Sequence, residues 1–394
     1  MIIFYELAQH GMSHAQFARV FVQTAASACP DEQLRMYAQP SHLACVFDGG
    51  DPQLDGRVEK LPFTSRHAGF WKRALTALRF LHQTYGPLQA ERPQVIFLTG
   101  EPCHIWAARL YRMVTPGFRC HLVLHGDIND MRGPRSRNPL RRLQDYVCSI
   151  GRARHADVRM LTLENHIRTN IDAILPGTAP YIDVFRHPCL PVSIDWAAAN
   201  PAERELRFGL LGIAGRSKGL DVFARLALRA RRDLGRQPSF RLIGKLQSGT
   251  EHLDLGGISG PLPFSKEWLP RAQFDDELTR LHYVILPYNM DYYGLSASGV
   301  LLDVLRWRKP MIAFDTPVVR ELVAQFGDIG YICQSEDEMA QVIDSLIDGF
   351  DSARYALQQR NLDAAYRARL PEKMAAEFLA LRGAPLPAPA LKAA

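Results

Sequence analysis

The sequence lacks any apolar run long enough to cross a membrane. No window of about 18 consecutive apolar residues occurs, roughly the length that a transmembrane helix requires, so we expect no such helix. The apolar start at 1–5 has no basic residues before it and meets Glu6 at once. A secretory signal begins with a basic flank, so this run predicts a first buried strand instead.

Paired cysteines and metal-binding patterns are also missing. The seven cysteines are scattered, their number is odd, and no two form a CxxC pair. We therefore expect free thiols and a reducing compartment, which favours a cytoplasmic location. The thirteen histidines do not join the cysteines at the spacing of a zinc site. We expect no metal and no other cofactor.

Neither sign of charge is in large excess, since 47 basic and 41 acidic side chains leave a net charge of +6. The basic residues are unevenly spread, however, because eight arginines between Met131 and Arg159 face only Asp145 and Asp157. Such a surface attracts phosphates, whether on a lipid leaflet, a phospholipid-linked substrate or a nucleic acid. A solvated helix face is the alternative, and both stay open. The eight are Arg132, Arg135, Arg137, Arg141, Arg142, Arg152, Arg154 and Arg159.

Short apolar runs alternate with helical patterns along the whole chain. In the first half, strands are predicted at 2–7, 34–38, 95–98, 120–124, 158–163 and 181–185, and helices at 15–28, 67–85, 105–113 and from Asn165. After a turn-rich break at 187–191, a second series of strands follows at 207–213, 240–243, 283–286, 311–314 and 330–332, again with helices between them. This alternation predicts parallel sheets that are covered on both faces.

We predict an α/β fold with two Rossmann-like, doubly wound domains, at 1–190 and 191–350. Residues 351–382 are predicted as helices that pack back on the first domain, and 383–394 as a flexible tail rich in alanine and proline. Two such domains place a cleft between them, and ligands bind at the carboxyl ends of parallel strands. We therefore expect the strand ends of both domains to face a central cleft.

One strand–loop–helix segment has the chemistry of an anion site. A buried strand ends at Pro287, a polar and aromatic loop follows, and a helix starts near Ser298. The first turn of a helix leaves N–H groups unpaired, and small residues let an anion approach them. This arrangement favours a diphosphate, although an ordinary serine N-cap has the same pattern. The small residues are Ser296, Ser298 and Gly299, and Tyr293 and Gly294 lie in the same loop.

An acidic residue follows in the predicted helix. Asp303 lies one turn past Gly299, so the two residues face the same way. A carboxylate at this point can accept hydrogen bonds from two ribose hydroxyls. The next segment, 306–314, leads through Lys309 and Pro310 into an apolar strand.

The order of strand, proline, aromatic and glycine loop, small residues, acid, Lys-Pro and apolar strand resembles the donor-binding segment of GT-B glycosyltransferases. The likeness is to family 4, the retaining type found in bacterial exopolysaccharide synthesis. In that family a glutamate seven residues before the proline binds the nucleotide ribose, and Asp303 stands at that distance from Pro310. The family's earlier acid, which contacts the donor sugar, is replaced by Leu295, so Asp291 would serve only if the loop carries an insertion. Glu321 resembles the acid of the following motif, and we expect it to be structural.

A second segment, 210–221, matches the family's strand, glycine, basic residue and Lys-Gly that open a helix. The resemblance implies that Arg216 and Lys218, beside Gly215, pair with the donor diphosphate. They would offset the leaving-group charge as the sugar–phosphate bond breaks, in the place of a metal. The alternative is that Lys218 is a solvent-facing turn residue.

The N-terminal half matches the family only in architecture. His125 follows a buried strand, where the family often has a histidine that faces the donor sugar, which implies a catalytic role. A histidine whose hydrogen bonds are satisfied within the structure is the alternative. We assign Asp127, and Gly11 and His14 after the first strand, to the acceptor side. Weaker candidates at other strand ends are Glu101 and Glu164.

The predicted function is transfer of a glycosyl unit from a nucleoside diphosphate sugar to a hydroxyl acceptor, with retention as the resemblance implies, in polysaccharide or glycoconjugate synthesis. No carboxylate nucleophile is evident, which favours a front-face mechanism. The alternatives are a GT-B sugar-nucleotide epimerase and a non-catalytic nucleotide-sugar-binding relative. A nucleic-acid partner is not expected, because no aromatic-interleaved or helix-turn-helix pattern accompanies the arginines. The acceptor is expected to be a lipid-linked sugar or a saccharide, with the arginines from Arg132 to Arg154 on an anionic inner-membrane surface.

Overall fold

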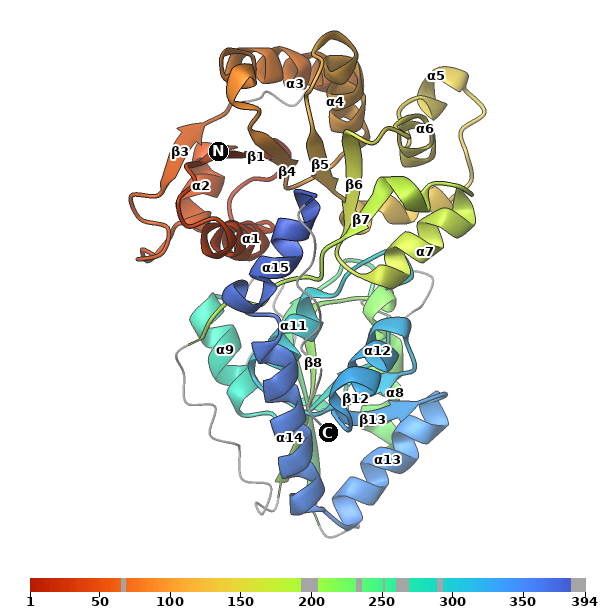
Figure 1. Cartoon of the computed structure of the whole chain (residues 1–394). Coiled ribbons are helices and arrows are strands. Elements are labelled where there is room, and N and C mark those ends of the chain that lie inside the picture. Colours follow the sequence, from red (N-terminus) through yellow and green to blue (C-terminus); the bar gives the residue numbers. More distant parts are fainter. Residues whose placement is uncertain are drawn as a thin grey trace. The chain divides into compact units, whose positions relative to one another are not determined.

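The computed structural model describes residues 1–64, 69–192, 205–231, 236–250, 252–259, 269–288 and 293–383. The chain divides into two compact units. Unit 1 contains Met1–Pro191, Gly294–Ala297 and Arg369–Ala394, and unit 2 contains Val192–Tyr293 and Ser298–Ala368. Each unit is built around one parallel sheet with helices on its faces (Figure 1).

Unit 1 has a seven-stranded sheet in the order β3-β2-β1-β4-β5-β6-β7. Every pair of neighbouring strands in it is parallel. Parallel neighbours require a crossover between them, which is why helices separate most of the strands in the sequence. The strands are β1 (Ile2–Glu6), β2 (Leu34–Ala38), β3 (Val58–Pro62), β4 (Gln94–Phe97), β5 (Cys120–Val123), β6 (Val158–Thr162) and β7 (Ile182–Val184).

Both faces of this sheet are buried, because alternate side chains of a strand point to opposite sides. Ile3 and Tyr5 join one core, under helices α3 (Phe70–Thr84), α4 (Pro102–Val114), α6 (Tyr146–Arg152) and α7 (Asn165–Ile174). Ile2 and Phe4 join the other core, under α1 (Ala15–Ala28), α2 (Pro40–Val46) and α15 (Pro371–Leu381). The helices α1 and α15 pack against each other there (Figure 1). Burial on both faces explains why β1 is a continuous apolar run.

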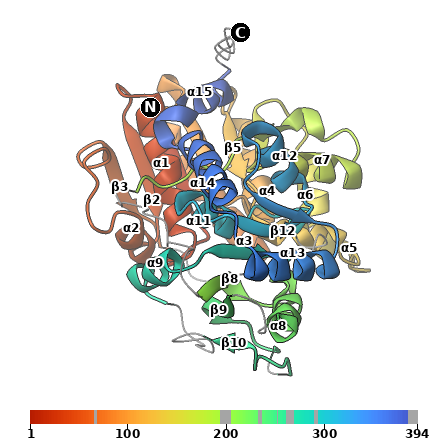
Figure 2. The ribbon, with the colours of Figure 1, turned by 90° about the horizontal axis from the view of Figure 1, so that it is seen from below.

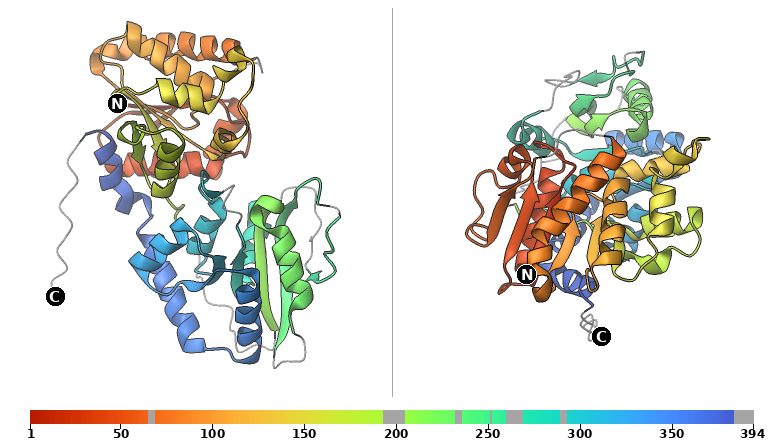
Figure 3. Two further views of the ribbon diagram at one scale, coloured as in Figure 1. Left: turned by 90° about the vertical axis from the view of Figure 1, so that its right-hand side faces the viewer. Right: turned by 90° about the horizontal axis from the view of Figure 1, so that it is seen from above.

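Unit 2 has a six-stranded parallel sheet in the order β10-β9-β8-β11-β12-β13. Helix α8 (Leu220–Arg229) runs along β8 and also contacts α13 (Glu336–Asp348) (Figure 3). Helix α14 (Ser352–Arg367) packs on α11 (Gly299–Arg306) and α12 (Pro317–Phe326) (Figure 2). The strands are β8 (Glu205–Ala214), β9 (Gln237–Leu246), β10 (Ile258–Ser259), β11 (Tyr283–Leu286), β12 (Met311–Phe314) and β13 (Gly330–Cys333).

The predicted fold class, two α/β units with parallel sheets, is confirmed. The sequence analysis missed several elements, among them α2, α6 and β3 in unit 1 and β10 in unit 2. β3 is an edge strand with exposed charges at Glu59 and Lys60, so it lacks the apolar run that marks a buried strand. The segment predicted as one group of C-terminal helices is divided, because α14 belongs to unit 2 and α15 to unit 1. Pro371 begins α15, and a proline favours such a break.

Within the described ranges, no helix is both long enough and apolar enough to span a membrane.

A buried ion pair joins the beginning of the C-terminal segment of unit 1 to the end of β6. Arg369 Nη1 donates to Glu164 Oε1 at 2.9 Å and to the carbonyl of His187 at 3.2 Å. Both charged side chains are at most 5% exposed. The carbonyl of Arg369 in turn accepts from the N–H of Cys189 at 2.8 Å. Arg369 thereby holds α15 in its place beside α1.

Replacing Arg369 by methionine leaves the Glu164 carboxylate buried and without its cation. We expect the free energy of unfolding to fall by about 3 kcal/mol, because breaking one side of a buried pair typically costs 3–5 kcal/mol. The double variant Arg369→Met with Glu164→Gln should recover part of this loss, as measured by urea denaturation. Arg367→Met is the matched control, since its pair with Asp363 is exposed and should change stability by less than about 1 kcal/mol. A single variant as stable as this control would show that the buried pair does not hold α15.

Candidate functional site

The order of the strands places the candidate residues of both units at the carboxyl ends of the strands, where the winding of the sheet reverses. The winding of a doubly wound sheet reverses between β1 and β4 in unit 1 and between β8 and β11 in unit 2. Ligands of such sheets bind outside the carboxyl ends of the strands at this point. His10 to His14 follow β1, Arg216 and Lys218 follow β8, and the loop that begins at Pro287 follows β11.

Two glycines shape the turn between β8 and α8. A Cβ at Gly219, where φ is +71°, would lie 2.0 Å from the carbonyl oxygen of Pro287, and a Cβ at Gly215 would lie 1.7 Å from Gln247 Oε1. Only glycine fits at Gly219, where the neighbour is backbone and φ is left-handed, whereas a side chain at Gly215 would displace Gln247. The turn therefore packs directly on the end of β11, with the short helix η4 (Arg216–Lys218) between the two glycines.

Lys218 is half-buried and directed toward β8. Its Nζ donates to the carbonyl of Leu211 at 3.3 Å, and a Cβ at Gly212 would lie 2.6 Å from the same nitrogen. Within the described part of the chain this bond uses one of the three donors of the ammonium group. Loss of hydration lowers the pKa of Lys218 to about 8, while the negative charge of Asp303 opposes the shift. Arg216, by contrast, is exposed and lies 3.2 Å from Nε2 of His252.

Ser298 is the N-cap of α11. An ordinary serine N-cap was the alternative to an anion site in the sequence analysis. Its hydroxyl accepts from the N–H of Leu301 at 3.2 Å and lies 2.7 Å from the hydroxyl of Tyr288. Tyr288 stacks on Tyr293, with ring centroids 3.9 Å apart. The side-chain oxygen of Ser298 is thus engaged within the protein. Gly299 is exposed, and a Cβ there would meet no atom within 4 Å, so the backbone at the start of α11 is open to a ligand.

Ser296 and Gly294, which were predicted beside the donor diphosphate, belong to the segment Gly294–Ala297, which clusters with unit 1. The hydroxyl of Ser296 accepts from the amide of Asn129 at 2.6 Å, and the carbonyl of Gly294 accepts from the amide of Asn170 at 2.6 Å. Leu295 between them is fully buried in an apolar core. A carboxylate at Leu295 would be buried among apolar side chains, which explains why an acid is absent there. Asp291 lies outside the described residues.

Asp303 belongs to an ion-pair network on α11 and α9 (Arg271–Thr279). Its Oδ1 accepts from Arg271 Nη2 at 2.7 Å, and the same nitrogen lies 2.7 Å from Oδ1 of Asp275. Burial raises the pKa of Asp303, and the charge of Arg271 opposes this. The network holds Asp303 by one carboxylate oxygen, so the carboxylate is oriented before any ligand arrives. The sequence analysis missed Arg271, whose only signal is its i,i+4 spacing from Asp275.

In unit 1, His125 is held in one tautomer. Its Nε2 lies 2.7 Å from the carbonyl oxygen of Leu98, and a carbonyl only accepts, so Nε2 carries the proton. The ring packs edge-to-face against His14 and Phe17. Burial, and then the charge of His14, lower the pKa of His125 well below its usual value. His125 is therefore neutral at pH 7, and its Nδ1 presents a lone pair that accepts a hydrogen bond.

The loop after β1 brings further histidines to the same edge of the sheet. Gly11 has a left-handed φ of +51°, and its carbonyl lies 2.9 Å from Nδ1 of the buried His42. His14 precedes α1, is exposed and also has a left-handed φ of 55°, which is uncommon outside glycine. His187 packs on Phe17, and burial lowers its pKa to about 4. Asp127 lies in the short helix η2 (Gly126–Arg132), and its side chain is outside the described structure.

The two weaker candidates in unit 1 have structural partners. Glu164 pairs with Arg369, as described above, and Glu101 pairs with Arg73 and caps α4. In the part of the chain that the structure describes, Glu101, Cys103 and His104 are the one group close enough to share a metal ion. Burial raises the pKa of Cys103 to about 12, and Arg73 already neutralises Glu101, so the group is poorly suited to a cation.

Sequence analysis also missed Glu6, the last residue of β1. Its carboxylate is buried, accepts from the hydroxyl of Thr99 at 2.8 Å and from the N–H groups of Ala8 and Gln9 at 3.2 Å each. Burial raises the pKa of Glu6 to about 7. The carboxylate fixes the start of the loop that leads to Gly11.

No family model matches the chain, and no curated protein sequence matches it. Solved structures match almost its full length. The structure of HepE from Anabaena, in complex with UDP and glucose, has a TM-score of 0.59 at 15% identity and covers 97% of this chain and 100% of its own. WaaG, a glycosyltransferase involved in lipopolysaccharide biosynthesis, has a TM-score of 0.59 at 11% identity, with 95% and 98% covered. The glycosyltransferase of kitacinnamycin has a TM-score of 0.50 at 15% identity, with 98% and 99% covered.

At these identities the likeness concerns the fold. In both parallel sheets the first strand pairs with the fourth, β1 with β4 and β8 with β11. This strand order agrees with the likeness in fold. The chain has the GT-B fold, with one Rossmann-like sheet in each unit.

Proposed function

We propose that this protein is a glycosyltransferase that moves a sugar from a nucleoside diphosphate sugar to a hydroxyl acceptor with retention. The observation that carries the proposal is Lys218, a half-buried cation with unused donors in the described structure, beside the end of β11 and the open start of α11. The GT-B fold supports it, as does the complex of HepE with UDP and glucose.

Unit 2 supplies the groups that would bind the donor. Lys218 and Arg216 would neutralise the diphosphate, and the backbone N–H groups at the start of α11, near Gly299, would donate hydrogen bonds to its oxygens, since a helix N-terminus attracts anions. Asp303, held by Arg271 through one oxygen, would accept hydrogen bonds from the ribose hydroxyls. The two cations would stabilise the negative charge of the departing nucleoside diphosphate, which is the role that a metal has in other transferases.

In unit 1, His125 would accept a hydrogen bond from the substrate rather than donate a proton to it. Its Nδ1 lone pair suits a sugar hydroxyl and repels a phosphate oxygen, which carries no proton to donate. A front-face mechanism assigns the proton transfer to the substrate itself. The acceptor oxygen bonds to the anomeric carbon on the face from which the phosphate oxygen departs, and the acceptor's proton passes to that phosphate oxygen. Gly11, His14 and Asp127 remain our candidates for the acceptor side.

A non-catalytic nucleotide-sugar-binding protein is the second candidate, and Leu295 favours it. The position that resembles the family's sugar-contacting acid holds a buried leucine. Turnover separates the candidates. Release of UDP, GDP or ADP from the matching sugar nucleotide supports a transferase, binding without release supports the second candidate, and isomerised donor without acceptor would indicate an epimerase.

Donor binding should stabilise the native protein. One of UDP, GDP or ADP, tested with their sugars, should raise the melting temperature of the native protein, because a ligand that binds only the folded state adds about 2.7 kcal/mol at one hundred times its Kd. Lys218→Ala should remove most of this rise. Lys373→Ala, which changes an exposed lysine of α15, is the control and should keep it. A rise that is unchanged in Lys218→Ala would exclude the lysine from the donor site.

Donor affinity should also depend on pH through Lys218. The ammonium form binds the diphosphate, and burial sets its pKa at about 8, so the affinity should be constant below about pH 7.5. Above pH 8 the affinity should fall, by about tenfold per pH unit at most, in calorimetric titrations. Lys218→Arg stays charged over the whole range and should therefore bind with no such fall. An equal loss of affinity in both proteins would place the titrating group elsewhere, for instance on the donor phosphate.

The arginine-rich segment of unit 1 suggests where the protein acts. Leu140 is 62% exposed on α5 (Pro139–Arg142), next to Arg141 and Arg142. An exposed apolar residue among arginines suits the interface of an anionic membrane. We therefore propose a cytoplasmic protein that associates peripherally with the inner membrane, with a lipid-linked or saccharide acceptor in exopolysaccharide synthesis.

Sedimentation with liposomes tests this proposal. The protein should pellet with vesicles that contain phosphatidylglycerol and stay in solution with neutral phosphatidylcholine vesicles. Changing Arg141 and Arg142 to alanine should reduce binding by about thirtyfold, since each basic residue near the surface contributes about 1 kcal/mol. Changing Arg79, an exposed arginine of α3, should have no effect. Equal sedimentation with both kinds of vesicle would count against a membrane surface.

A further inference from the structure

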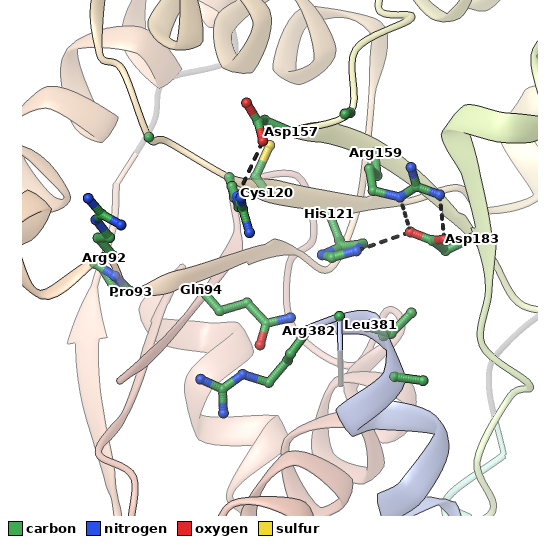
Figure 4. A pocket seen from close by; sticks show the side chains of 15 residues that line it. Arg92, Pro93, Gln94, Cys120, His121, Asp157, Arg159, Asp183, Leu381 and Arg382 are labelled. Carbon is green, nitrogen blue, oxygen red and sulfur yellow. Dashed lines mark hydrogen bonds and ion pairs between the residues drawn. The ribbon is translucent and has the colours of Figure 1, made fainter. Parts of the chain in front are cut away.

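Unit 1 contains a second polar site. It lies at the amino ends of the strands, whereas His125 lies at their carboxyl ends. A cavity of about 580 Å³ opens at the beginning of strands β4, β5 and β6 (Figure 4). Its walls come from the first residues of these strands, from the loops that precede them, and from the end of α15 at Ala380 to Gly383. None of the residues assigned above to sugar transfer lines it.

Three buried polar atoms in the lining have no hydrogen-bond partner among the described residues: Nε2 and Oε1 of Gln94, and Nδ1 of His121. Gln94 begins β4 and His121 lies in β5, and Figure 4 shows both side chains in the cavity. The His121 residue is 7% exposed. A buried polar group that stays unpaired destabilises a protein by about 1–3 kcal/mol, so three on one cavity wall point to a bound polar molecule.

The tautomer of His121 is fixed by Asp183. Nε2 of His121 lies 3.2 Å from Oδ2 of Asp183, and a carboxylate only accepts, so Nε2 carries the proton. Arg159 donates to the other carboxylate oxygen at 2.6 Å. Burial acts against the charge of Asp183, but the hydrogen bonds from Arg159 and His121 lower its pKa to about 2. In the neutral ring, Nδ1 therefore presents a lone pair into the cavity, where it can accept from a hydroxyl group.

The charge of the lining is positive. Arginines outnumber aspartates by two, since Arg92, Arg119, Arg159 and Arg382 face Asp157 and Asp183. Arg159 is engaged with Asp183, and Arg382 with Glu32. Arg92 and Arg119 lie exposed at the rim, where the side chain of Arg119 is 78% accessible even though it contacts Asp157. The planar guanidinium group binds phosphate through two parallel hydrogen bonds, so this rim suits a phosphate group.

We propose that this cavity binds a phosphorylated, hydroxylated molecule of monosaccharide size. The amide of Gln94 donates to one hydroxyl and accepts from another, Nδ1 of His121 accepts from a third, and Arg92 and Arg119 bind the phosphate. The ligand contacts the end of α15, so it joins that helix to β4 and β5. The site lies at the amino ends of the strands, whereas the substrates of the proposed transferase would bind at the carboxyl ends of strands. A ligand here accordingly regulates or stabilises the protein and is not consumed by it.

Calorimetric titration of the full chain tests the proposal, with glucose 6-phosphate, glucose and inorganic phosphate as probes. We expect glucose 6-phosphate to bind at least about tenfold more tightly than either of the others, because it alone engages both sets of groups. Gln94→Leu should weaken it about tenfold and should not lower the melting temperature, since that change removes two unpaired polar atoms. Arg92→Ala should weaken it to a similar extent, and Arg79→Ala, an equal change of charge outside the lining, should not.

Two results would overturn the site. One is the absence of measurable binding of glucose 6-phosphate. The other is binding that survives both Gln94→Leu and Arg92→Ala but is lost in Lys218→Ala, because the phosphate would then occupy unit 2. The proposed transfer reaction does not depend on either result, since donor binding and turnover are measured with variants of Lys218.

Discussion

The close contact between Gly219 and the carbonyl of Pro287 determines the arrangement of the candidate donor site in unit 2. It packs the turn after β8 on the end of β11 with no room for a side chain. Lys218 is one residue away, so the turn carries its ammonium group out of water and against β8, where it is held by the Leu211 carbonyl. The position of Lys218 therefore follows from this backbone contact, whereas the orientation of Asp303 depends separately on Arg271.

In unit 1 the comparable constraint is that the buried histidines near the carboxyl ends of the strands are uncharged. Burial keeps His42, His125 and His187 neutral, and each has a ring nitrogen at a backbone carbonyl. An edge built from neutral imidazoles recognises hydroxyl groups without attracting anions. The candidate residues of the two units therefore differ in chemistry, because those of unit 2 include the cations Lys218 and Arg216, whereas this part of unit 1 presents neutral imidazoles.

The sequence predicted the fold well because burial on both sheet faces leaves continuous apolar runs, as in β1 and β11. It also placed Lys218 in the turn after β8 and Asp303 in the helix that follows β11, since both follow a recognisable strand. It could not predict partners that the tertiary fold brings from far away in the chain. The hydroxyl of Ser296 accepts from the amide of Asn129, for example, and nothing near either residue in the sequence indicates that pairing. Arg271 and the Gln94–His121 cavity were missed for the same reason, because their residues come from different elements and share no local pattern.

The position of α15 has a consequence for how the protein is made. Met374 and Phe378, near the C-terminus, complete a core whose other members lie mostly among the first hundred residues, and Phe378 contacts Phe21 with ring centroids 6.0 Å apart. During translation the apolar face of α1 leaves the ribosome long before the helix that covers it is synthesised. Unit 1 therefore cannot finish folding in the order of its synthesis. It waits for α15 while unit 2 is being made, and in that interval the apolar face of α1 is not yet covered by that helix.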